Sequence, residues 1–413
     1  MGLQVVVVGA GLAGLAAAIA LHRAGHNVKV IEQSGFHNEV GAAIHIAPNA
    51  TRVLKDLGCD FNSLHPVQCN RLQVWDPNGS LLWTPVVTKD LQILLGTTDN
   101  WVLTHRVDLH NTLRDAATQK IDGRTIDISL SSRVASVDPE AGVVRLENGD
   151  TFIGDLIVGA DGIHSRAVKA IVGDERGKES TGQNCFRFLV PLAKALANPL
   201  TAALLSKTGL DGVHAFSGPD RRLVIYPCRN GNLLNIVAIH PAGSDKAKEA
   251  SWLESADLEQ LLQTYSSFGP ELRELCGMAE DLKLWSLVSR SPPRTFIKGK
   301  MALVGDAAHP TLPHQGQGGA QAFEDAAALG GVFPADTRPD QVTQRLALYN
   351  KVRYDRAVTV MMMSKTHDER RAEMLAELRE YVPNAEVPKD MFSFTWPSNP
   401  AEDARRLLAE QTS

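Results

Sequence analysis

The first part of the chain alternates between apolar runs and helix-forming stretches. A β-branched run at 4–8, bounded by glycine, is typical of a buried parallel strand. The alanine-rich segment 12–25 ends at a glycine and predicts a helix, and 27–32 predicts a second strand. These three elements form a βαβ unit. Further helices are expected at 49–58 and 107–119.

The pattern changes in the middle of the chain. Alternating apolar and polar residues at 125–130 and 142–146 predict antiparallel strands. More strands are expected at 156–158, 185–191, 222–227, 233–240 and 301–304, and helices at 256–278, 317–331 and 340–380. The predicted fold class is α/β, or an α+β composite. It combines a discontinuous Rossmann-like domain, an inserted antiparallel-sheet substrate domain and C-terminal helices.

Three glycine-containing turns, each directly after a predicted strand, mark the pieces of the Rossmann-like domain. They lie at 9–14, 159–162 and 305–306, and the antiparallel region separates the last two. The expected pieces of the nucleotide-binding domain are 1–75, 101–180 and 291–340. The substrate domain is expected at 76–100 and 181–290, and a helical region at 341–413.

Composition narrows the class of protein. The chain has 413 residues, of which 44% are hydrophobic and 22% charged, as in ordinary globular proteins. Its net charge of −5 offers no basic excess for nucleic acid. Five scattered cysteines without a C-x-x-C pair predict no disulfide framework, and histidines without an H-E-x-x-H pattern predict no metal site. The apolar run 5–21 has neither the length of a membrane span nor a positively charged leader, so we expect a cytoplasmic protein.

The sequence G-A-G-L-A-G at 9–14 predicts a dinucleotide site. Gly9 permits the tight turn, Gly11 lets the backbone approach a pyrophosphate, and Gly14 lets helix and strand pack closely. Glu32 closes the second strand and can accept hydrogen bonds from ribose hydroxyls, which does not distinguish NAD from FAD. We include Leu12, Ala13 and Gln33 in the expected cofactor site.

Two further motifs follow this fingerprint in order. They are G-A-D-G-I-H-S-R at 159–166 and G-D-A-A-H-P at 305–310. With them the chain resembles the class A flavoprotein aromatic hydroxylases, which have the para-hydroxybenzoate hydroxylase fold. It is most similar to the salicylate hydroxylase and 6-hydroxynicotinate 3-monooxygenase branch. The matching stretches are 5–49, 101–117, 155–169 and 300–331.

The resemblance implies a set of FAD contacts. Gly9, Gly11, Gly14 and Glu32 would hold the ADP half. Arg106 would reach the pyrophosphate and ribityl, Asp161 would contact FAD and the nicotinamide nucleotide, Gly305 and Asp306 would hold the ribityl, and Pro310 would lie beside the isoalloxazine.

The glycine-rich segment 313–319 opens a predicted helix. Gly316, Gly318 and Gly319 would let backbone N–H groups approach a ligand, and the positive end of the helix dipole would stabilise charge on reduced flavin. Family members often have Ala-Gln-Gly-Ala/Gly here, whereas this chain has Gly-Gln-Gly-Gly at 316–319.

Several side chains are candidates for the substrate pocket. The resemblance places His45 beside the flavin, as a structural histidine, a flavin contact or a covalent attachment point. Arg222 and Tyr226 are four apart on a strand and share a face, where the arginine suits a carboxylate. Arg187, expected on a strand next to that of Arg222, could bind a carboxylate in the same way, and His214 lies near the same predicted sheet. His314 is the candidate for easing phenol deprotonation. Each sheet residue has a purely structural alternative.

The resemblance also implies the reaction. One FAD, reduced by NADH or NADPH, would react with O2 to give a flavin C4a-hydroperoxide that hydroxylates a phenolic aromatic acid of the ortho- or para-hydroxybenzoate type. The attacked carbon would bear the carboxylate, so we expect oxidative decarboxylation with loss of CO2. Plain hydroxylation, epoxidation and a non-catalytic regulator are the alternatives. No second glycine fingerprint is present for the nicotinamide nucleotide, so transient binding is expected. The protein is expected to be a monomer or homodimer.

Overall fold

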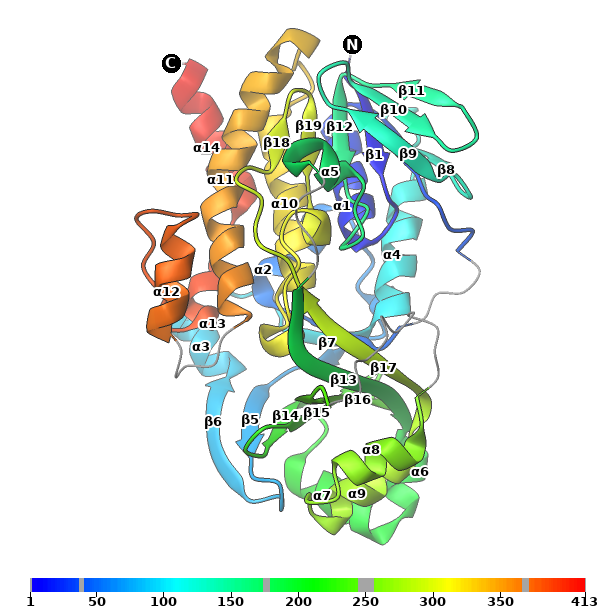
Figure 1. The fold of residues 1–413 in the computed structure, drawn as a ribbon, viewed down its shortest axis with the longest axis vertical. Helices are drawn as coiled ribbons and strands as arrows, with labels where there is room; N and C mark the ends of the chain where they lie inside the picture. Colours follow the sequence, from blue (N-terminus) through cyan, green and yellow to red (C-terminus); the bar gives the residue numbers. More distant parts are fainter. Residues whose placement is uncertain (1, 37–40, 174–178, 244–255, 366–370, 413) are drawn as a thin grey trace.

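The chain folds into two bodies joined by a small sheet (Figure 1). The computed structural model describes residues 2–36, 41–173, 179–243, 256–365 and 371–412. One body holds a six-stranded sheet and the other a seven-stranded sheet. The expected α/β composite with an inserted antiparallel sheet is confirmed.

The six-stranded sheet is built from four separated parts of the chain. In order, its strands are β18 (Ile297–Lys298), β19 (Met301–Leu303), β12 (Leu156–Gly159), β1 (Gln4–Val8), β2 (Asn27–Ile31) and β8 (Asp127–Ser129). All neighbours pair in parallel except β18 with β19. The carboxyl ends of parallel strands meet at one edge, so the turns after β1, β12 and β19 come together there.

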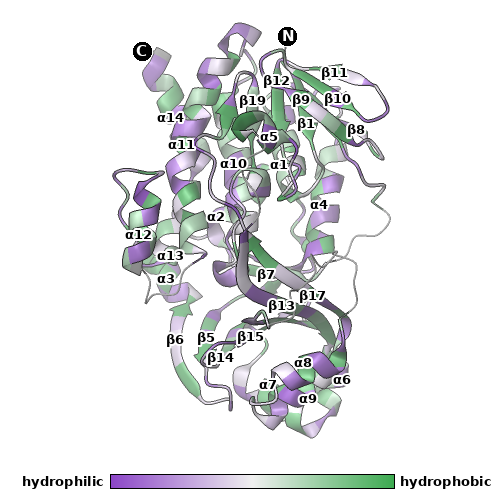
Figure 2. Ribbon diagram, viewed as in Figure 1, coloured by the Kyte–Doolittle hydropathy of each residue, from purple (hydrophilic) through white to green (hydrophobic). Residues whose placement is uncertain are grey.

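Helices flank this sheet. Helix α1 (Leu12–Arg23) packs against α10 (Gly318–Val332) and α4 (Arg106–Thr118). Figure 2 shows β1, β12 and β19 as hydrophobic, as expected for parallel strands covered on both faces. A small antiparallel sheet of β9 (Val134–Asp138), β10 (Val143–Leu146) and β11 (Thr151–Ile153) lies beside it, and α5 (Ala167–Val172) follows β12.

The seven-stranded sheet carries the inserted domain. In order, its strands are β17 (Glu280–Ser289), β13 (Glu179–Pro191), β16 (Leu233–Pro241), β15 (Arg222–Cys228), β14 (Gly212–Ser217), β5 (Arg71–Trp75) and β6 (Leu81–Val87). Only β14 and β5 pair in parallel. One face packs on α6 (Leu192–Ala197), α7 (Pro199–Thr208), α8 (Leu258–Thr264) and α9 (Pro270–Gly277). The other face looks toward the first body.

A third sheet connects the two bodies. It contains β3 (Ala43–Ile46), β7 (Val102–His105) and β4 (Val67–Gln68). The remaining helices are α2 (Pro48–Asp56), α3 (Thr88–Leu95), α12 (Arg371–Arg379) and α13 (Met391–Thr395), together with α11 (Val342–Met363) and α14 (Pro400–Thr412), which pack on each other and on α10. Within the described ranges, every helix is too short or too polar to cross a lipid bilayer.

The structure adds elements that the sequence pattern did not predict. Among them are β3, β5, β6, β7, β14, β17 and helices α3, α5, α6 and α7. The boundary expected at 75/76 falls between β5 and β6, although both strands belong to the seven-stranded sheet, and the boundary at 180/181 falls inside β13. Part of the helix expected at 340–380 lies outside the described residues.

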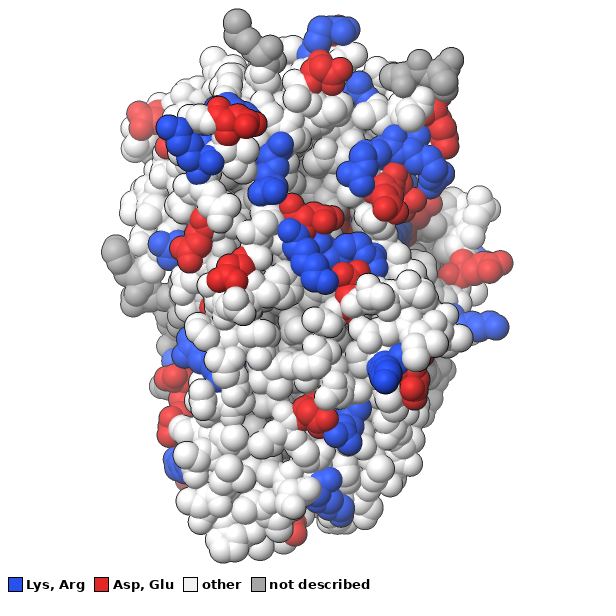
Figure 3. All heavy atoms as spheres, turned by 180° about the vertical axis from the view of Figure 1, so that it is seen from behind, with Lys and Arg blue, Asp and Glu red and all other residues white. Residues whose placement is uncertain are grey.

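Charges on the back of the molecule are mixed. Figure 3 shows lysine and arginine side chains interspersed with aspartate and glutamate. The face in view therefore carries no extended field of one sign. In the described ranges, no cluster of three or more histidine, cysteine or acidic side chains is placed to hold a metal ion.

Candidate active site

The turn after β1 is shaped for an anionic ligand. Gly9 has φ of +101°, and a Cβ on Gly14 would lie 1.9 Å from the Gly9 carbonyl oxygen. A Cβ on Gly11 would meet no protein atom within 4 Å, so the space in front of it is open. Helix α1 begins there without a side-chain cap and without an acidic residue in its first turn. Its N–H groups are therefore available to a phosphate group.

The carboxylate of Glu32 holds this turn. Its Oε2 accepts a hydrogen bond from the Ala10 N–H at 2.7 Å, and its Oε1 accepts one from the Ser34 N–H at 2.7 Å. Ala13 packs against the motif at 305–310, because a Cβ on Gly305 would lie 2.7 Å from the Ala13 Cβ. Gln33 is exposed at the rim. A hydrogen bond from a ribose hydroxyl to Glu32 is compatible with this geometry and stays a prediction.

The two other acidic motif residues differ in surroundings. Asp161 accepts hydrogen bonds from the Arg166 and Ala167 N–H groups at 2.6 and 3.0 Å, so its carboxylate caps the start of α5. Asp306 is open to solvent, yet the surrounding protein desolvates it enough to raise its pKa, against the nearby positive charges of Arg106 and Arg290. The structure thus brings Arg106 and Asp306 to one place.

The glycine-rich segment before α10 packs closely on β3. A Cβ on Gly316, which has φ of +60°, would lie 1.5 Å from Nε2 of His45, and one on Gly319 would lie 3.0 Å from Cδ1 of Ile44. A Cβ on Gly318 would lie 2.6 Å from the Thr311 hydroxyl. These glycines therefore make room for protein side chains, a reason that the sequence did not reveal.

Other residues of the segment connect it to its surroundings. Pro310 is buried after the Gly305–Ala307 turn. Nε2 of His314 lies 3.0 Å from Oε1 of Gln183 on β13, which joins the segment to the seven-stranded sheet. Helix α10 starts without a side-chain cap or an acidic residue in its first turn.

A fully buried charge network underlies the segment. Arg353 of α11 donates to Glu324 at 2.6 Å and to Asp325 at 2.7 Å, and all three side chains have 0% exposure. Asp325 also accepts from the Gly305 N–H at 2.8 Å and lies 2.6 Å from Nε2 of His309. Arg353 thereby fixes the turn that carries Asp306.

The network sets the protonation of its acids. Burial alone would raise the pKa of Glu324, but the guanidinium groups of Arg356 and Arg353 outweigh it and lower that pKa to about 2. Burial likewise opposes ionisation of Asp325, yet His309 and Arg353 hold its pKa below the usual range. Both carboxylates are therefore charged at neutral pH.

Acid is expected to destabilise the protein through this network. Folding lowers the pKa of Glu324 from 4.5 to about 2, so between these values the unfolded chain binds the proton more tightly. The stabilisation is complete above pH 4.5 and is lost as the pH falls toward 2, at roughly 3 kcal/mol for Glu324 alone. Urea unfolding at a series of pH values measures the loss, and a flat free energy of unfolding across this window would contradict it.

One face of the seven-stranded sheet gathers the candidate substrate residues. Tyr226 is paired with Asn235, and Arg222 with Ile239, so all four lie on the face toward β3. The Tyr226 hydroxyl donates to the Ala43 carbonyl at 2.9 Å, and the Ala43 N–H donates to Asn235 Oδ1 at 2.9 Å. Burial raises the pKa of Tyr226. This tyrosine ties the sheet to β3 and stays protonated.

The two candidate arginines lie on the same face but on separate strands. Strand β16 separates Arg187 from Arg222, which the sequence had placed on neighbouring strands. Arg187 stacks on Trp285, with the guanidinium carbon 4.8 Å from the ring centroid. Arg222 is half-buried, burial lowers its pKa, and its guanidinium has no hydrogen-bond partner among the described residues. Such a group is suited to bind an anion.

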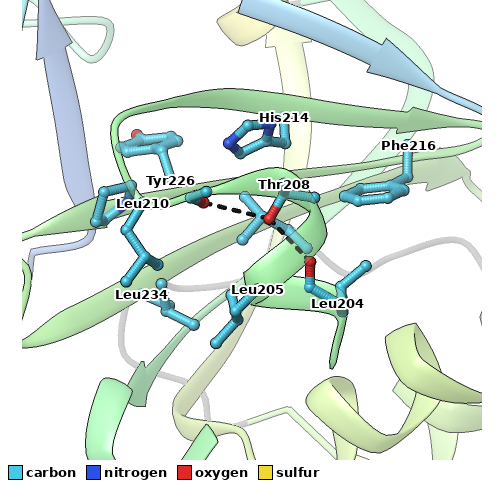
Figure 4. A pocket seen from close by; sticks show the side chains of 11 residues that line it. Leu204, Leu205, Thr208, Leu210, His214, Phe216, Tyr226 and Leu234 are labelled. Atoms are coloured by element: carbon cyan, nitrogen blue, oxygen red, sulfur yellow. Dashed lines mark hydrogen bonds between the residues drawn. The ribbon is translucent and has the colours of Figure 1, made fainter. Parts of the chain in front are cut away.

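His214 lies apart from these residues. It is paired with Ile225, and adjacent residues of a strand point to opposite faces, so it shares the helix-covered face and not the face of Tyr226. It lines a small cavity with Leu204, Thr208 and Phe216 (Figure 4). Burial lowers its pKa to about 4. The structure therefore does not bring His214 to the substrate face.

Sequence reasoning missed several residues of this region. They are Trp101, Gln183, Asn235, Glu324, Asp325 and Arg353. For Glu324, Asp325 and Arg353 the signal was their charge within predicted helices, and it was weak because charged residues in helices are usually exposed.

The fold and these turns define a dinucleotide-binding enzyme scaffold with an inserted substrate sheet. Residues 2–364 match the family described as FAD binding domain. The chain is 35% identical to the FAD-dependent monooxygenase cfoG of Aspergillus candidus, over 94% of this chain and 90% of the relative. It is 36% identical to hispidin-3-hydroxylase of Neonothopanus nambi, over 86% of each. A crystal structure of CtdE with FAD and a substrate superposes with a TM-score of 0.79 at 22% identity, covering 99% of both chains.

The protein belongs to this FAD-binding family and is a FAD-dependent monooxygenase. The resemblance to class A aromatic hydroxylases is thereby confirmed. The cofactor fits the residues present, because the space before Gly11 is open and helix α1 begins there without a side-chain cap. Covalent attachment through His45 stays a prediction.

Proposed function

We propose that the protein uses NADH or NADPH and O2 to hydroxylate the ring of a phenolic aromatic acid. The observation that carries this proposal is Arg222, a half-buried guanidinium without a hydrogen-bond partner among the described residues, on the sheet face that Tyr226 shares. A carboxylate would satisfy both of its parallel donors. The name of hispidin-3-hydroxylase supports hydroxylation as the reaction.

The side chains of this face would orient the substrate and exclude water. Bound FAD would carry two electrons from the nicotinamide nucleotide to O2, of which one oxygen atom enters the ring and the other leaves as water. Arg222 would hold the carboxylate, and His314, oriented by Gln183, would draw the phenolic proton. The same sheet face carries the buried apolar side chains of Val237 and Ile239, which belong to one cluster with Leu312. Apolar side chains exclude water, and exclusion of water limits the release of hydrogen peroxide.

Product analysis tests the reaction. The holoenzyme is incubated with both nicotinamide nucleotides, O2 and a panel of ortho- and para-hydroxybenzoates. The masses of the products are measured by mass spectrometry. A product that gains one oxygen supports the proposal. Loss of CO2 as well supports attack at the carbon bearing the carboxylate, whereas retention of CO2 supports plain hydroxylation. Cofactor oxidation that yields only hydrogen peroxide across the panel contradicts this substrate class.

Arg222→Gln is expected to raise KM for a carboxylated phenol about 10- to 150-fold, because a charged hydrogen bond contributes ~1.5–3 kcal/mol. The affinity for FAD should not change. The matched control is Arg221→Gln, one residue away, because Arg221 instead pairs with Asp220 at 2.7 Å. Steady-state kinetics with the acid and with the corresponding phenol measure the effect. An equal rise in KM for the uncharged phenol would contradict carboxylate binding by Arg222.

A further inference from the structure

His45 is held between two parts of the site. On one side, its Nδ1 accepts a hydrogen bond from the indole N–H of Trp101 at 3.1 Å. On the other side, its Nε2 lies against Gly316, where a Cβ would come within 1.5 Å. The structure gives His45 no other hydrogen bond among the described residues, and its side chain is only partly buried.

Trp101 is itself fixed by the C-terminal part of the chain. It is 1% exposed, and its ring centroid lies 5.5 Å from that of Trp396 and 6.2 Å from that of Phe392. Arg52 donates to the carbonyl oxygen of Trp396 at 3.4 Å and pairs with Asp99 at 2.8 Å. Packing against Phe392 of α13 and against Trp396 thus fixes the orientation of the indole N–H toward His45. Rotation of the indole ring would disrupt this aromatic cluster.

A fixed donor on Nδ1 determines where the proton of a neutral imidazole resides. When Nδ1 accepts, Nε2 must carry the hydrogen. Although part of the side chain is accessible, the surrounding protein desolvates the ring and lowers the pKa of His45 to about 4, so the ring is neutral near neutral pH. The Nε2–H then lies at Gly316, in the segment that opens α10.

We propose that Trp101 is a positioning residue that holds His45 in its Nε2–H tautomer, so that His45 offers one hydrogen-bond donor to the bound flavin. This inference rests on FAD binding and not on the identity of the aromatic substrate. The C-terminal residues Phe392 and Trp396, which carry no recognisable motif, act on the site through Trp101. A neutral donor here adds no charge beside the flavin.

Nitrogen NMR of histidine-labelled holoenzyme near neutral pH tests the proposal. The His45 signals are assigned by their loss in His45→Gln. We expect a pyrrole-type Nε2 and a pyridine-type Nδ1 in the native protein, and a second tautomer in Trp101→Phe, which keeps the ring and removes the N–H. A protonated Nδ1 in the native protein, or an unchanged single tautomer in Trp101→Phe, would overturn the assignment.

Two further readouts complete the test. The Nε2 signal is expected to shift when FAD is added to FAD-depleted protein, and Trp101→Phe should weaken FAD binding about fivefold, as for one neutral hydrogen bond. An Nε2 chemical shift that does not change on addition of FAD would overturn the role of His45 as a hydrogen-bond donor to the flavin. Trp75→Phe is the matched control, because Trp75 is 3% exposed and its indole N–H has no partner in the described structure. Failure of hydroxylation in the product analysis would leave these results unaffected.

Discussion

Gly11→Ala is expected to raise the Kd for FAD at least about tenfold, or ~1.4 kcal/mol, while the stability of the FAD-free protein stays the same. The backbone at Gly11 has φ of −69° and ψ of −175°, which alanine adopts freely. The added methyl would meet no protein atom within 4 Å. It would therefore occupy only the space that the pyrophosphate needs. Fluorescence titration with FAD and thermal unfolding of the FAD-free variant measure the two effects.

Variants of two other glycines serve as controls for Gly11→Ala. Gly277→Ala also adds a methyl that meets no protein atom within 4 Å, but at the end of α9, so it should leave both quantities unchanged. Gly14→Ala places a Cβ 1.9 Å from the Gly9 carbonyl oxygen and should destabilise the FAD-free protein itself. Native FAD affinity in Gly11→Ala would show that the pyrophosphate does not bind at this turn.

Arg353→Met is expected to lower the free energy of unfolding by about 3–5 kcal/mol, because it leaves buried carboxylates without their partner. Glu324 keeps Arg356 at 2.7 Å, whereas Asp325 keeps no arginine partner among the described residues and retains the Gly305 N–H and His309. The turn at Gly305 should loosen, so FAD binding should weaken as well. Urea unfolding measures the stability, and titration measures the FAD affinity.

An exposed arginine provides the comparison. Arg338 pairs with Asp340 at 3.0 Å, but its side chain is 65% exposed. Solvent screens such a pair, so Arg338→Met should cost less than about 1 kcal/mol. If both variants lose the same small amount, the buried network does not hold the site together.

Much of the fold could be predicted because its signals are local. The run of valines in β1, the glycines at 9–14 and the acid at the end of β2 all lie within about thirty residues. A βαβ unit is formed by neighbouring segments, so its pattern can be read directly. The strands β5, β6 and β14 escaped prediction because their register contains irregularities or their neighbours lie far away in the chain.

The candidate site was predicted only in part. The face of Tyr226 and Arg222 followed from their spacing of four on one strand, and the structure retains it. The face of His214 depended on its pairing with Ile225, which no local pattern contains. The separation of Arg187 from Arg222 depended on β16, a strand that comes later in the chain than either residue.

The sequence by itself determined the cofactor fold, the glycine turn and the class of enzyme, because tight turns and buried parallel strands impose residue types at short spacing. Only the tertiary structure decided what surrounds the cofactor site. It brought Trp101 and Trp396 together beside His45, and it buried Arg353 between Glu324 and Asp325. These contacts join distant segments, and their energy comes from exclusion of water, which a pattern along one segment does not encode.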